Sequence, residues 1–227
     1  MVLLILNERM LKDIKLVIFD LDGTLVDAYP AIVRSFNLTM RKLNLPTQKS
    51  TVIHRAVGWG DKNLLKPFVG DKNISMALRI YRKDHKTSLR QKTKFLPHAK
   101  DLLAYLKKKK YRLAIASNRP TKFTHIILEH LKVKDWFDYI LCGDKMKRSK
   151  PHPDILLKTL NRFSLRPQEA VYVGDMTVDV LAGKRAKIKT IAVATGSNTK
   201  KELQKLKPFR LIDHVGELKK ILDGAAG

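Results

Sequence analysis

Two carboxylates, separated by one residue, follow a short apolar run near the start of the chain. Asp20 and Asp22 flank Leu21, and Gly23 and Thr24 come next. If the chain turns at Gly23, both carboxylates face nearly the same point, which is costly unless a cation or a shared proton relieves them. Magnesium prefers sparse oxygen ligation of this kind. The segment therefore predicts a divalent cation site, although Asp22-Gly23 alone fits a tight turn equally well.

Further polar residues follow later apolar runs. Ser117 and Asn118 end the second run, Lys150 lies in the loop after the third, and Gly174-Asp175 ends the fourth. Ligands of open parallel sheets bind beyond the carboxyl ends of the strands. We therefore expect two carboxylates, a hydroxyl and an amine to converge on one rim, where a hydroxyl and an amide at a helix start suit a phosphoryl oxygen.

These residues also have structural interpretations. Ser117 and Asn118 precede a predicted helix, where helix caps belong. Lys150 fits a solvated loop lysine, and Asp179 fits a carboxylate that complements the first turn of its helix. The order and placement of the segments, more than any one residue, favour a catalytic site over these structural interpretations.

Five apolar runs with helix-period stretches between them predict the architecture. Nearly continuous apolar runs fit strands buried on both faces, and their alternation with helices predicts an α/β fold with a doubly wound parallel sheet. The runs are Leu16 to Phe19, Leu113 to Ala116, Tyr139 to Cys142, Val171 to Val173 and Ile191 to Ala194.

One interval breaks this alternation. About ninety residues separate the first run from the second, whereas a parallel crossover needs only about a dozen. We expect an inserted helical cap domain at residues 27–96, with hinges near 25–29 and 94–98, and a core made of residues 1–26 and 97–227. The helical patterns in the insert are Ile32, Val33, Phe36, Met40 and Leu43, then Asn63 to Phe68, then Ile74 to His85.

Composition excludes several classes of protein. The single Cys142 rules out an intramolecular disulfide and a multi-cysteine metal site, which favours a reducing cytoplasm. The apolar opening, residues 1–6, is shorter than a signal-peptide core, and nothing else approaches about 18 apolar residues in a row. We expect a cytoplasmic protein with no membrane partner. No heptad seam indicates an oligomeric state.

The formal net charge of +25 predicts attraction to anions. Phosphorylated substrates, nucleic acid and acidic surfaces all fit it. The lysines are spread along the chain, and the longest run, Lys107 to Lys110, closes a predicted helix where cations suit the helix dipole. A basic solvated surface is therefore the favoured interpretation, with nucleic-acid binding as the alternative.

The chain resembles the haloacid dehalogenase superfamily of phosphatases. Nearly the whole sequence takes part, and the helical insert looks like the small helical cap of the phosphoglycolate phosphatase-like branch. The resemblance implies a Rossmann-like core and a magnesium-dependent phosphomonoester hydrolase that acts on a small anionic phosphorylated substrate. The four motifs are, in order, Asp20-Leu21-Asp22-Gly23-Thr24, Ser117-Asn118, Lys150-Pro151 and Gly174-Asp175-Met176-Thr177-Val178-Asp179.

The resemblance also implies roles for single residues. Asp20 would attack phosphorus to form an aspartyl phosphate, while Asp22 would protonate the leaving oxygen and later take a proton from water. Thr24 would orient Asp22 or the turn. The phosphoryl charge would be met by Mg²⁺, Lys150, Ser117 and Asn118, and the metal by Asp20, Asp22, Asp175 and Asp179, the last either through a water or by holding Lys150 instead.

Residues of the insert would read the leaving group. The loop with Gly58, Trp59 and Gly60 resembles the cap loop of the same branch, and Arg55 could meet a substrate carboxylate or phosphate. Trp59 also fits the core of the cap, and Arg55 a surface cation.

Two rival functions are open besides hydrolysis of a phosphoglycolate-like ester, a sugar phosphate or a nucleotide. Sugar phosphomutases of the superfamily have a histidine shortly after the first motif, where this chain reads Tyr29-Pro30-Ala31-Ile32-Val33. Its absence favours hydrolysis. The other rival is a basic nucleic-acid-binding protein on a hydrolase fold, which the four intact motifs disfavour.

Overall fold

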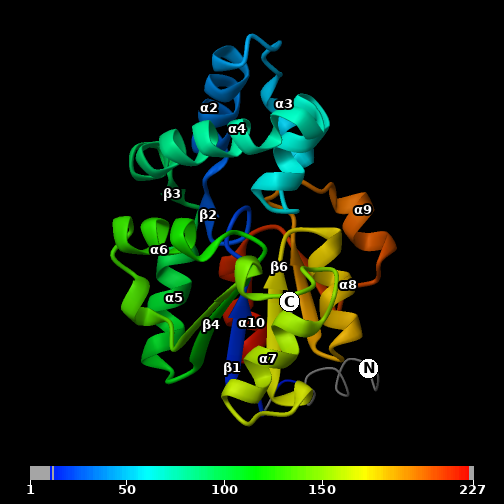
Figure 1. The fold of residues 1–227 in the computed structure, drawn as a ribbon. Helices are drawn as coiled ribbons and strands as arrows, with labels where there is room; N and C mark the ends of the chain where they lie inside the picture. The colour runs from blue at the N-terminus through cyan, green and yellow to red at the C-terminus, as the bar shows by residue number, and fades with distance from the viewer. Residues whose placement is uncertain (1–10, 12, 225–227) are drawn as a thin grey trace.

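A six-stranded parallel sheet forms the centre of the computed structural model, which describes residue 11 and residues 13–224. The spatial order is β5-β4-β1-β6-β7-β8, so β1 lies between β4 and β6 (Figure 1). The strands are β1 (Leu16–Phe19), β4 (Arg112–Ser117), β5 (Tyr139–Cys142), β6 (Ala170–Gly174), β7 (Lys189–Val193) and β8 (Arg210–Ile212).

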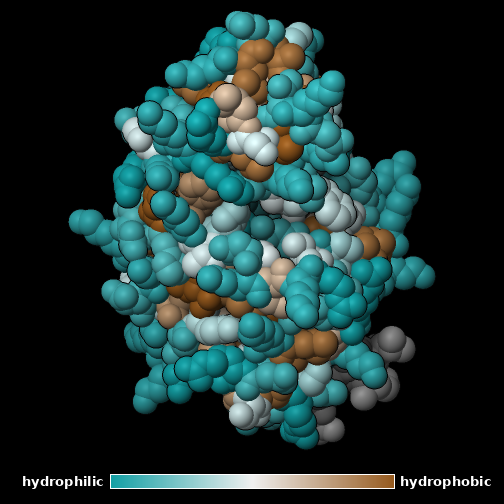
Figure 2. Space-filling model, viewed as in Figure 1, coloured by the Kyte–Doolittle hydropathy of each residue, from teal (hydrophilic) through white to brown (hydrophobic). Residues whose placement is uncertain are grey.

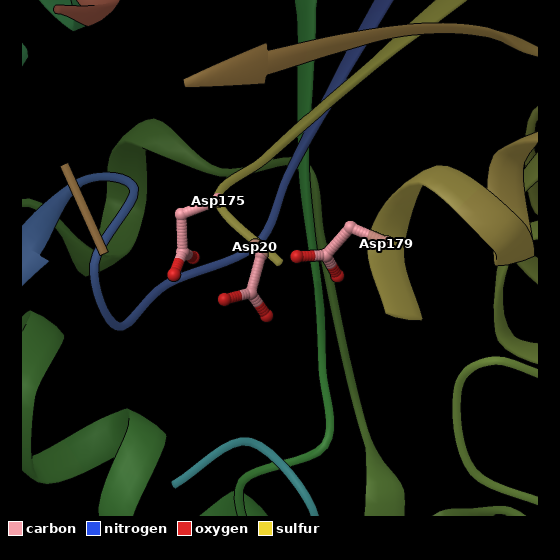
Figure 3. Close-up of side chains that lie close together, drawn as sticks. All are labelled: Asp20, Asp175 and Asp179. Atoms are coloured by element: carbon pink, nitrogen blue, oxygen red, sulfur yellow. The ribbon is translucent and has the colours of Figure 1, made fainter. Parts of the chain in front are cut away.

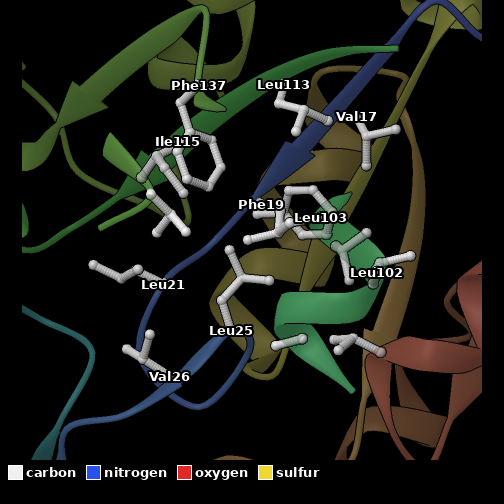
Figure 4. Close-up of a cluster of buried hydrophobic side chains, with 14 of the residues drawn as sticks. Val17, Phe19, Leu21, Leu25, Val26, Leu102, Leu103, Leu113, Ile115 and Phe137 are labelled. Atoms are coloured by element: carbon white, nitrogen blue, oxygen red, sulfur yellow. The ribbon is translucent and has the colours of Figure 1, made fainter. Parts of the chain in front are cut away.

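Helices cover both faces of this sheet, as the doubly wound prediction requires. Val17 and Phe19 of β1 pack with α5, α6 and α10, while Leu16 and Ile18 pack with α7 and α8 (Figure 4 shows the first side). Successive strand residues point to opposite faces, which is why the fully buried run carries no polar alternation. The helices are α5 (Ala99–Lys108), α6 (Thr121–His130), α7 (Asp154–Arg162), α8 (Thr177–Arg185), α9 (Lys200–Lys205) and α10 (Leu218–Leu222), with short 3-10 turns at Lys134–Trp136, Gly143–Lys145, Pro167–Glu169 and Val215–Glu217.

Three of the four helices between β1 and β4 form the helical insert, which stands over the carboxyl ends of the strands (Figure 1). It has its own hydrophobic cluster, which includes Phe36, Leu65 and Tyr81. Helix α4 bends at Gly70, whose φ of 71° leaves the helical region, so it contains the two helical stretches that the sequence predicted. The helices are α2 (Tyr29–Lys42), α3 (Ser50–Ala56) and α4 (Asp61–Lys92).

A short antiparallel ribbon joins the insert to the core. Strand β2 (Val26–Asp27) pairs with β3 (Lys94–Phe95), with Val26 opposite Phe95 and Asp27 opposite Lys94. The ribbon occupies the two positions where the sequence predicted hinges. The chain therefore leaves and re-enters the core at one place.

Several elements were not predicted individually, among them α3, α9, α10 and β8. Strand β8 has only three residues and lies at the edge of the sheet, so it gives no apolar run. Helix α3 has seven residues and a single buried one, Ile53. The predicted burial of Cys142 is confirmed. The apolar opening, residues 1–6, lies outside the described residues, and within those that are described no helix is both long and apolar enough to cross a membrane.

Candidate active site

The predicted site residues lie on one rim of the sheet. Asp20 follows β1, Ser117 ends β4 and Asp175 follows β6, and these three strands are neighbours. Lys150 comes from the loop before α7. The rim opens into a pocket between the core and the helical insert, lined by Asp20, Asp22, Ser117, Asn118 and Lys150 from the core and by Gly58, Gly60, Tyr81 and His85 from the insert.

Lys150 is buried at the centre of the rim, with 2% of its side chain exposed. Its Nζ lies 2.7 Å from Asp20 Oδ1, 2.7 Å from Asp179 Oδ1 and 2.8 Å from the Tyr172 hydroxyl. Burial alone would lower the pKa of Lys150, but the carboxylates of Asp179 and Asp20 raise it above its usual value. The amine is therefore a charged group within the site, and the interpretation as a solvated loop lysine is wrong.

Three buried carboxylates face one another beside this lysine (Figure 3). Asp20, Asp175 and Asp179 each offer an oxygen, and these oxygens all lie within 4.8 Å of one another. Burial raises the pKa of Asp20 to about 6, against the opposing effect of Lys150. Burial and the neighbouring carboxylates of Asp179 and Asp20 raise the pKa of Asp175 well above its usual value.

The charge of this group suits a divalent cation. Three ionised carboxylates and one ammonium leave two negative charges in a site that water cannot screen, and hard cations with oxygen ligands relieve such an excess. Asp179 accepts three hydrogen bonds, from Lys150, Tyr172 and the Met176 N–H, whereas Asp175 accepts from Thr24 and, at 3.3 Å, from the Ser197 N–H. Asp20 and Asp175 therefore have more capacity left to hold an ion.

Asp22 does not join this group. Its two carboxylate oxygens accept hydrogen bonds from Nε and Nη2 of Arg119, at 2.6 and 2.8 Å. The carboxylate would have to leave Arg119 before it could bind an ion, so metal ligation by Asp22 stays a prediction. The other predicted role, acid-base chemistry, needs a carboxylate that faces the pocket, and Asp22 lines it.

Thr24 contacts a different carboxylate from the one expected. Its hydroxyl donates to Asp175 Oδ1 at 2.9 Å, so it orients Asp175 and not Asp22. Gly23 has a φ of 78°, and a Cβ there would lie 2.6 Å from Asp175 Oδ2. The tight turn at Asp22-Gly23 and the site are thus the same feature, because the turn makes room for Asp175.

Ser117 and Asn118 differ in what their side chains can do. Ser117 lines the pocket and leaves its hydroxyl proton available, since its Oγ accepts the Arg119 N–H at 3.3 Å. The Asn118 amide donates to the carbonyls of Gly58 and Lys150 and accepts the Lys150 N–H. Asn118 therefore ties together the loops around the pocket. Neither residue caps α6, whose N-cap is Pro120.

Asp179 serves both interpretations made from the sequence. Its Oδ2 accepts the Met176 N–H at 2.9 Å at the start of α8, and its Oδ1 lies beside Lys150 and the Tyr172 hydroxyl. It complements a helix start and holds the lysine with one carboxylate.

The predicted residues of the insert divide into two groups. Gly58 and Gly60 line the pocket, but Arg55 and Trp59 are not among its lining residues. Arg55 lies 3.0 Å from Glu202 and donates to the Ser197 carbonyl, and more than half of its side chain is exposed. Trp59 is 45% exposed, so it does not form the core of the insert either.

Three further residues at the site were missed. Tyr172 is a fully buried tyrosine within a parallel strand, and such a hydroxyl needs a partner, which was a usable signal. Arg119 stands directly after Ser117-Asn118, so its position was also a signal. His85 gave none, because a lone histidine on a helix has many possible surroundings.

Comparisons with known proteins agree with this site. The family model of haloacid dehalogenase-like hydrolases matches residues 17–193. A phosphoglycolate phosphatase of Nitrosococcus oceani is 29% identical over 225 residues, covering 96% of this chain and 100% of the relative. A phosphoglycolate phosphatase of Aquifex aeolicus is 33% identical over 182 residues, which are 80% of this chain and 85% of the relative.

Solved structures give the same answer. A predicted phosphoglycolate phosphatase from Haemophilus somnus superposes with a TM-score of 0.88 at 27% identity, covering 92% of this chain and 98% of that one. The shared fold, the four motifs on one rim and the family match all support the same family assignment. The chain belongs to the haloacid dehalogenase-like hydrolase family, among its phosphatases.

Proposed function

We propose that the protein hydrolyses small phosphomonoesters, with Mg²⁺ and with Asp20 as a covalent nucleophile. The convergence of Lys150, Asp175 and Asp179 on the carboxylate of Asp20 is the observation that carries this proposal. Phosphoryl transfer depends on positioning and on neutralising charge on the phosphoryl oxygens, which this cluster of one cation and three carboxylates around an ion would do.

The reaction has two steps. A carboxylate oxygen of Asp20 forms a bond to phosphorus while the ester P–O bond breaks, and Asp22, which must enter this step protonated, gives that proton to the departing alcohol oxygen. Water then attacks the phosphorus of the aspartyl phosphate, Asp22 takes a proton from that water, and the bond to Asp20 breaks to release inorganic phosphate. Lys150 and Ser117 would bind the phosphoryl oxygens in both steps.

Mg²⁺ held by Asp20 and Asp175 would supply further positive charge for the phosphoryl oxygens. Thr24 keeps Asp175 in place, and the raised pKa of Asp175 gives a reason for an ion there. Magnesium is the ion of choice because the site offers few, hard oxygen ligands and leaves room for substrate oxygens.

Residues 27–96 act in this proposal as a cap domain over the pocket. The ribbon that pairs Asp27 with Lys94 and the separate hydrophobic cluster of the insert support this division. A cap that closes over the pocket would exclude water other than the attacking one. The relatives named above make an ester like phosphoglycolate the first substrate to test, followed by sugar phosphates and nucleotides.

A phosphate-release assay tests the proposal. Wild type with Mg²⁺ should release phosphate from at least one ester of a panel that contains phosphoglycolate, sugar phosphates and nucleoside monophosphates. Asp20→Asn keeps the shape of the side chain and removes the nucleophile, so it should release none. Activity that survives Asp20→Asn would contradict the covalent mechanism, and an isomerised sugar phosphate in place of free phosphate would favour a mutase.

A further inference from the structure

A second cation, Arg119, lies at the pocket and belongs to none of the roles above. Its side chain is 7% exposed, against 11% for its partner Asp22. Nε and Nη2 of Arg119 bind the two oxygens of Asp22 in a two-point ion pair, a geometry that fixes a carboxylate in one plane. The proposed reaction requires the Asp22 carboxylate to be oriented toward the leaving oxygen and the attacking water.

The remaining nitrogen of Arg119 is bound by the helical insert. Nη1 lies 2.9 Å from Nε2 of His85 on α4, a histidine that is 1% exposed. Since arginine can only donate, Nε2 must be the acceptor, and the ring proton is assigned to Nδ1. Burial and the charge of Arg119 both lower the pKa of His85, which keeps the ring neutral and able to accept.

The far side of the histidine is anchored inside the insert. Nδ1 lies 3.3 Å from the hydroxyl of Ser35 on α2, and that hydroxyl donates to Asp84 at 2.8 Å. The Tyr81 ring stacks on the His85 ring with centroids 4.7 Å apart. A continuous path of hydrogen bonds therefore runs from α2, through His85 and Arg119, to the carboxylate of Asp22.

Two functions are conceivable for an arginine in this pocket: it could bind an anionic part of the substrate, or it could hold Asp22. Three of the five guanidinium N–H groups bind protein atoms, which leaves one on Nη1 and one on Nη2. A substrate carboxylate could reach Arg119 only through this remaining edge, whereas the edge formed by Nε and Nη2 is committed to Asp22. Holding Asp22 uses the bonds that are present, and the hold is strongest while that carboxylate is ionised, which is the state that takes the proton from water.

We infer that Arg119 is a positioning residue that aims the acid-base carboxylate of Asp22, and that His85 of the helical insert holds Arg119 in that position. The inference rests on the proposed function, because it assigns a partner to the residue that protonates the leaving oxygen. Arg119 keeps its bond to His85 only while the insert packs on the core, so proton transfer is coupled to the position of the insert.

The experiment compares two esters that differ in their need for a proton. An alkyl phosphate such as phosphoglycolate must have its leaving oxygen protonated, whereas p-nitrophenyl phosphate releases a stable anion without help. Asp22 also acts in the second step, which both esters share, so the comparison uses kcat/KM, which reports only the steps up to release of the alcohol. General acid catalysis contributes about 10²- to 10⁴-fold, so Asp22→Asn should lower kcat/KM by that much on the alkyl ester and far less on the aryl ester. The large effect on the alkyl ester and small effect on the aryl ester in Asp22→Asn are the reference for the other variants.

Arg119→Ala should reproduce the pattern in weaker form. We expect kcat/KM to fall about 10²-fold on the alkyl ester and by about threefold or less on p-nitrophenyl phosphate, because the lost function is proton transfer to the leaving oxygen. Arg119→Lys keeps a charge but not the two-point geometry, and it should fall between Ala and wild type. It also serves if the alanine variant does not fold, because it leaves a cation beside Asp22.

His85 offers a matched pair of variants. His85→Gln keeps an acceptor for Arg119, and His85→Leu fills a similar volume without one. We expect His85→Leu to lower kcat/KM on the alkyl ester by about tenfold and His85→Gln by about threefold or less, with little change on the aryl ester. Rescue by the acceptor is a result that general loss of packing would not give.

The outcomes separate this inference from the proposed function. If wild type releases phosphate and Asp22→Asn shows the leaving-group pattern, but the Arg119 variants lower both esters equally or neither, the inference alone is overturned. If KM for the alkyl ester rises and kcat does not change, Arg119 binds substrate and the inference is again overturned. A wild type that hydrolyses no ester defeats the proposed function, and the inference with it.

Discussion

Two buried cations, Lys150 and Arg119, each bind one of the two carboxylates of the first motif, but their partners come from different parts of the molecule. Lys150 touches Asp20, Asp179 and Tyr172, all of them in the core. Arg119 is shared between Asp22 of the core and His85 of the helical insert. Neutralisation at the nucleophile is therefore independent of the insert, whereas the hold on the acid-base residue requires it.

The largest effect is expected where the partners are all in the core. Lys150→Met leaves Asp20 and Asp179 buried without their cation, which should cost about 3–5 kcal/mol in the free energy of unfolding. Loss of a charged donor to the phosphoryl group should also lower kcat by about 10²- to 10³-fold. Denaturant unfolding and phosphate release measure the two effects.

Tyr172→Phe is the matched control for that variant. It removes only a neutral hydroxyl from the same cluster, so its cost should be about 1 kcal/mol. A Lys150→Met protein as stable as Tyr172→Phe would show that the lysine does not compensate the buried carboxylates.

The ion should act on the core cluster as well, with a smaller effect. At about 100 times its dissociation constant, Mg²⁺ should stabilise the protein by about 2.7 kcal/mol. The pKa of Asp20 is raised from 3.8 to about 6, so without the ion the folded state holds this proton more tightly than the unfolded state does. The bound proton on Asp20 therefore adds to the free energy of unfolding below about pH 4, and this contribution is lost as pH rises from about 4 to about 6.

Mg²⁺ competes with that proton, so the rise in Tm that it produces should be larger at about pH 8 than at about pH 5. Thermal unfolding at the two pH values, with and without Mg²⁺, gives the measurement. Asp175→Asn is the control, because it removes one carboxylate from the group and should reduce the shift at both. An equal shift in wild type at both pH values would mean that the ion binds elsewhere.

The contact between insert and core can be broken at Gly58. This residue has a φ of 109°, and a Cβ there would lie 2.2 Å from Sδ of Met176. Gly58→Ala must displace the flexible end of the Met176 side chain and also adopt a positive φ, at a cost of about 1–3 kcal/mol. If the loop that carries Gly58 moves instead, the weakened hold on Asp22 should lower kcat/KM on alkyl esters. Denaturant unfolding and the two-ester assay follow both effects.

Gly70→Ala is a matched control in the same insert. Gly70 also has a positive φ, 71°, but no atom lies within 4 Å of a Cβ there. Its ψ is 172°, a conformation that is essentially restricted to glycine, so the substitution should carry a backbone cost of about 1–3 kcal/mol and leave the ratio of the two esters unchanged. Equal kinetic effects from both glycines would indicate that backbone strain, and not the contact with Met176, is responsible.

The smallest effect is expected at Arg55. Its exposed pair with Glu202 should contribute about 1 kcal/mol or less, so Arg55→Gln should change the free energy of unfolding little. If Arg55 instead binds a substrate carboxylate or phosphate, as predicted from the sequence, Arg55→Gln should raise KM about tenfold or more. Steady-state kinetics on the alkyl ester decides between the two.

The cluster around Asp20 and Lys150 in the core could be predicted from the sequence, because it depends on residues at the ends of buried strands. Asp20, Ser117 and Asp175 each follow an apolar run, and parallel strands bring such positions together whatever the loops do. The ribbon at the hinges and the bend between two helical stretches of α4 were also readable, since both interrupt a hydrophobic pattern.

The insert half could not be predicted in the same way. The path from Ser35 through His85 to Arg119 joins residues of two helices and a loop, and periodicity gives a buried face but not which side chains meet across it. Arg55 and Trp59 were chosen for their chemistry beside a glycine loop, and the structure shows how far such a choice depends on where a loop turns. The hydrophilic face in Figure 2 likewise follows from the net charge of +25 without indicating a partner.

The antiparallel ribbon has a consequence for how the chain is made. Leu16 of β1 pairs with Arg112 and with Ala170, so its partners leave the ribosome long after β1 itself. The helices of the insert contact one another within residues 29–92, and contacts that are close in sequence form early. The insert can therefore fold first, and the pairing of β2 with β3 then brings the growing chain back beside β1 just before β4 is synthesised. Until its neighbours are synthesised, the apolar strand β1 is unpaired and prone to aggregation. The order of the elements shortens the wait for β4, whereas β6 follows later.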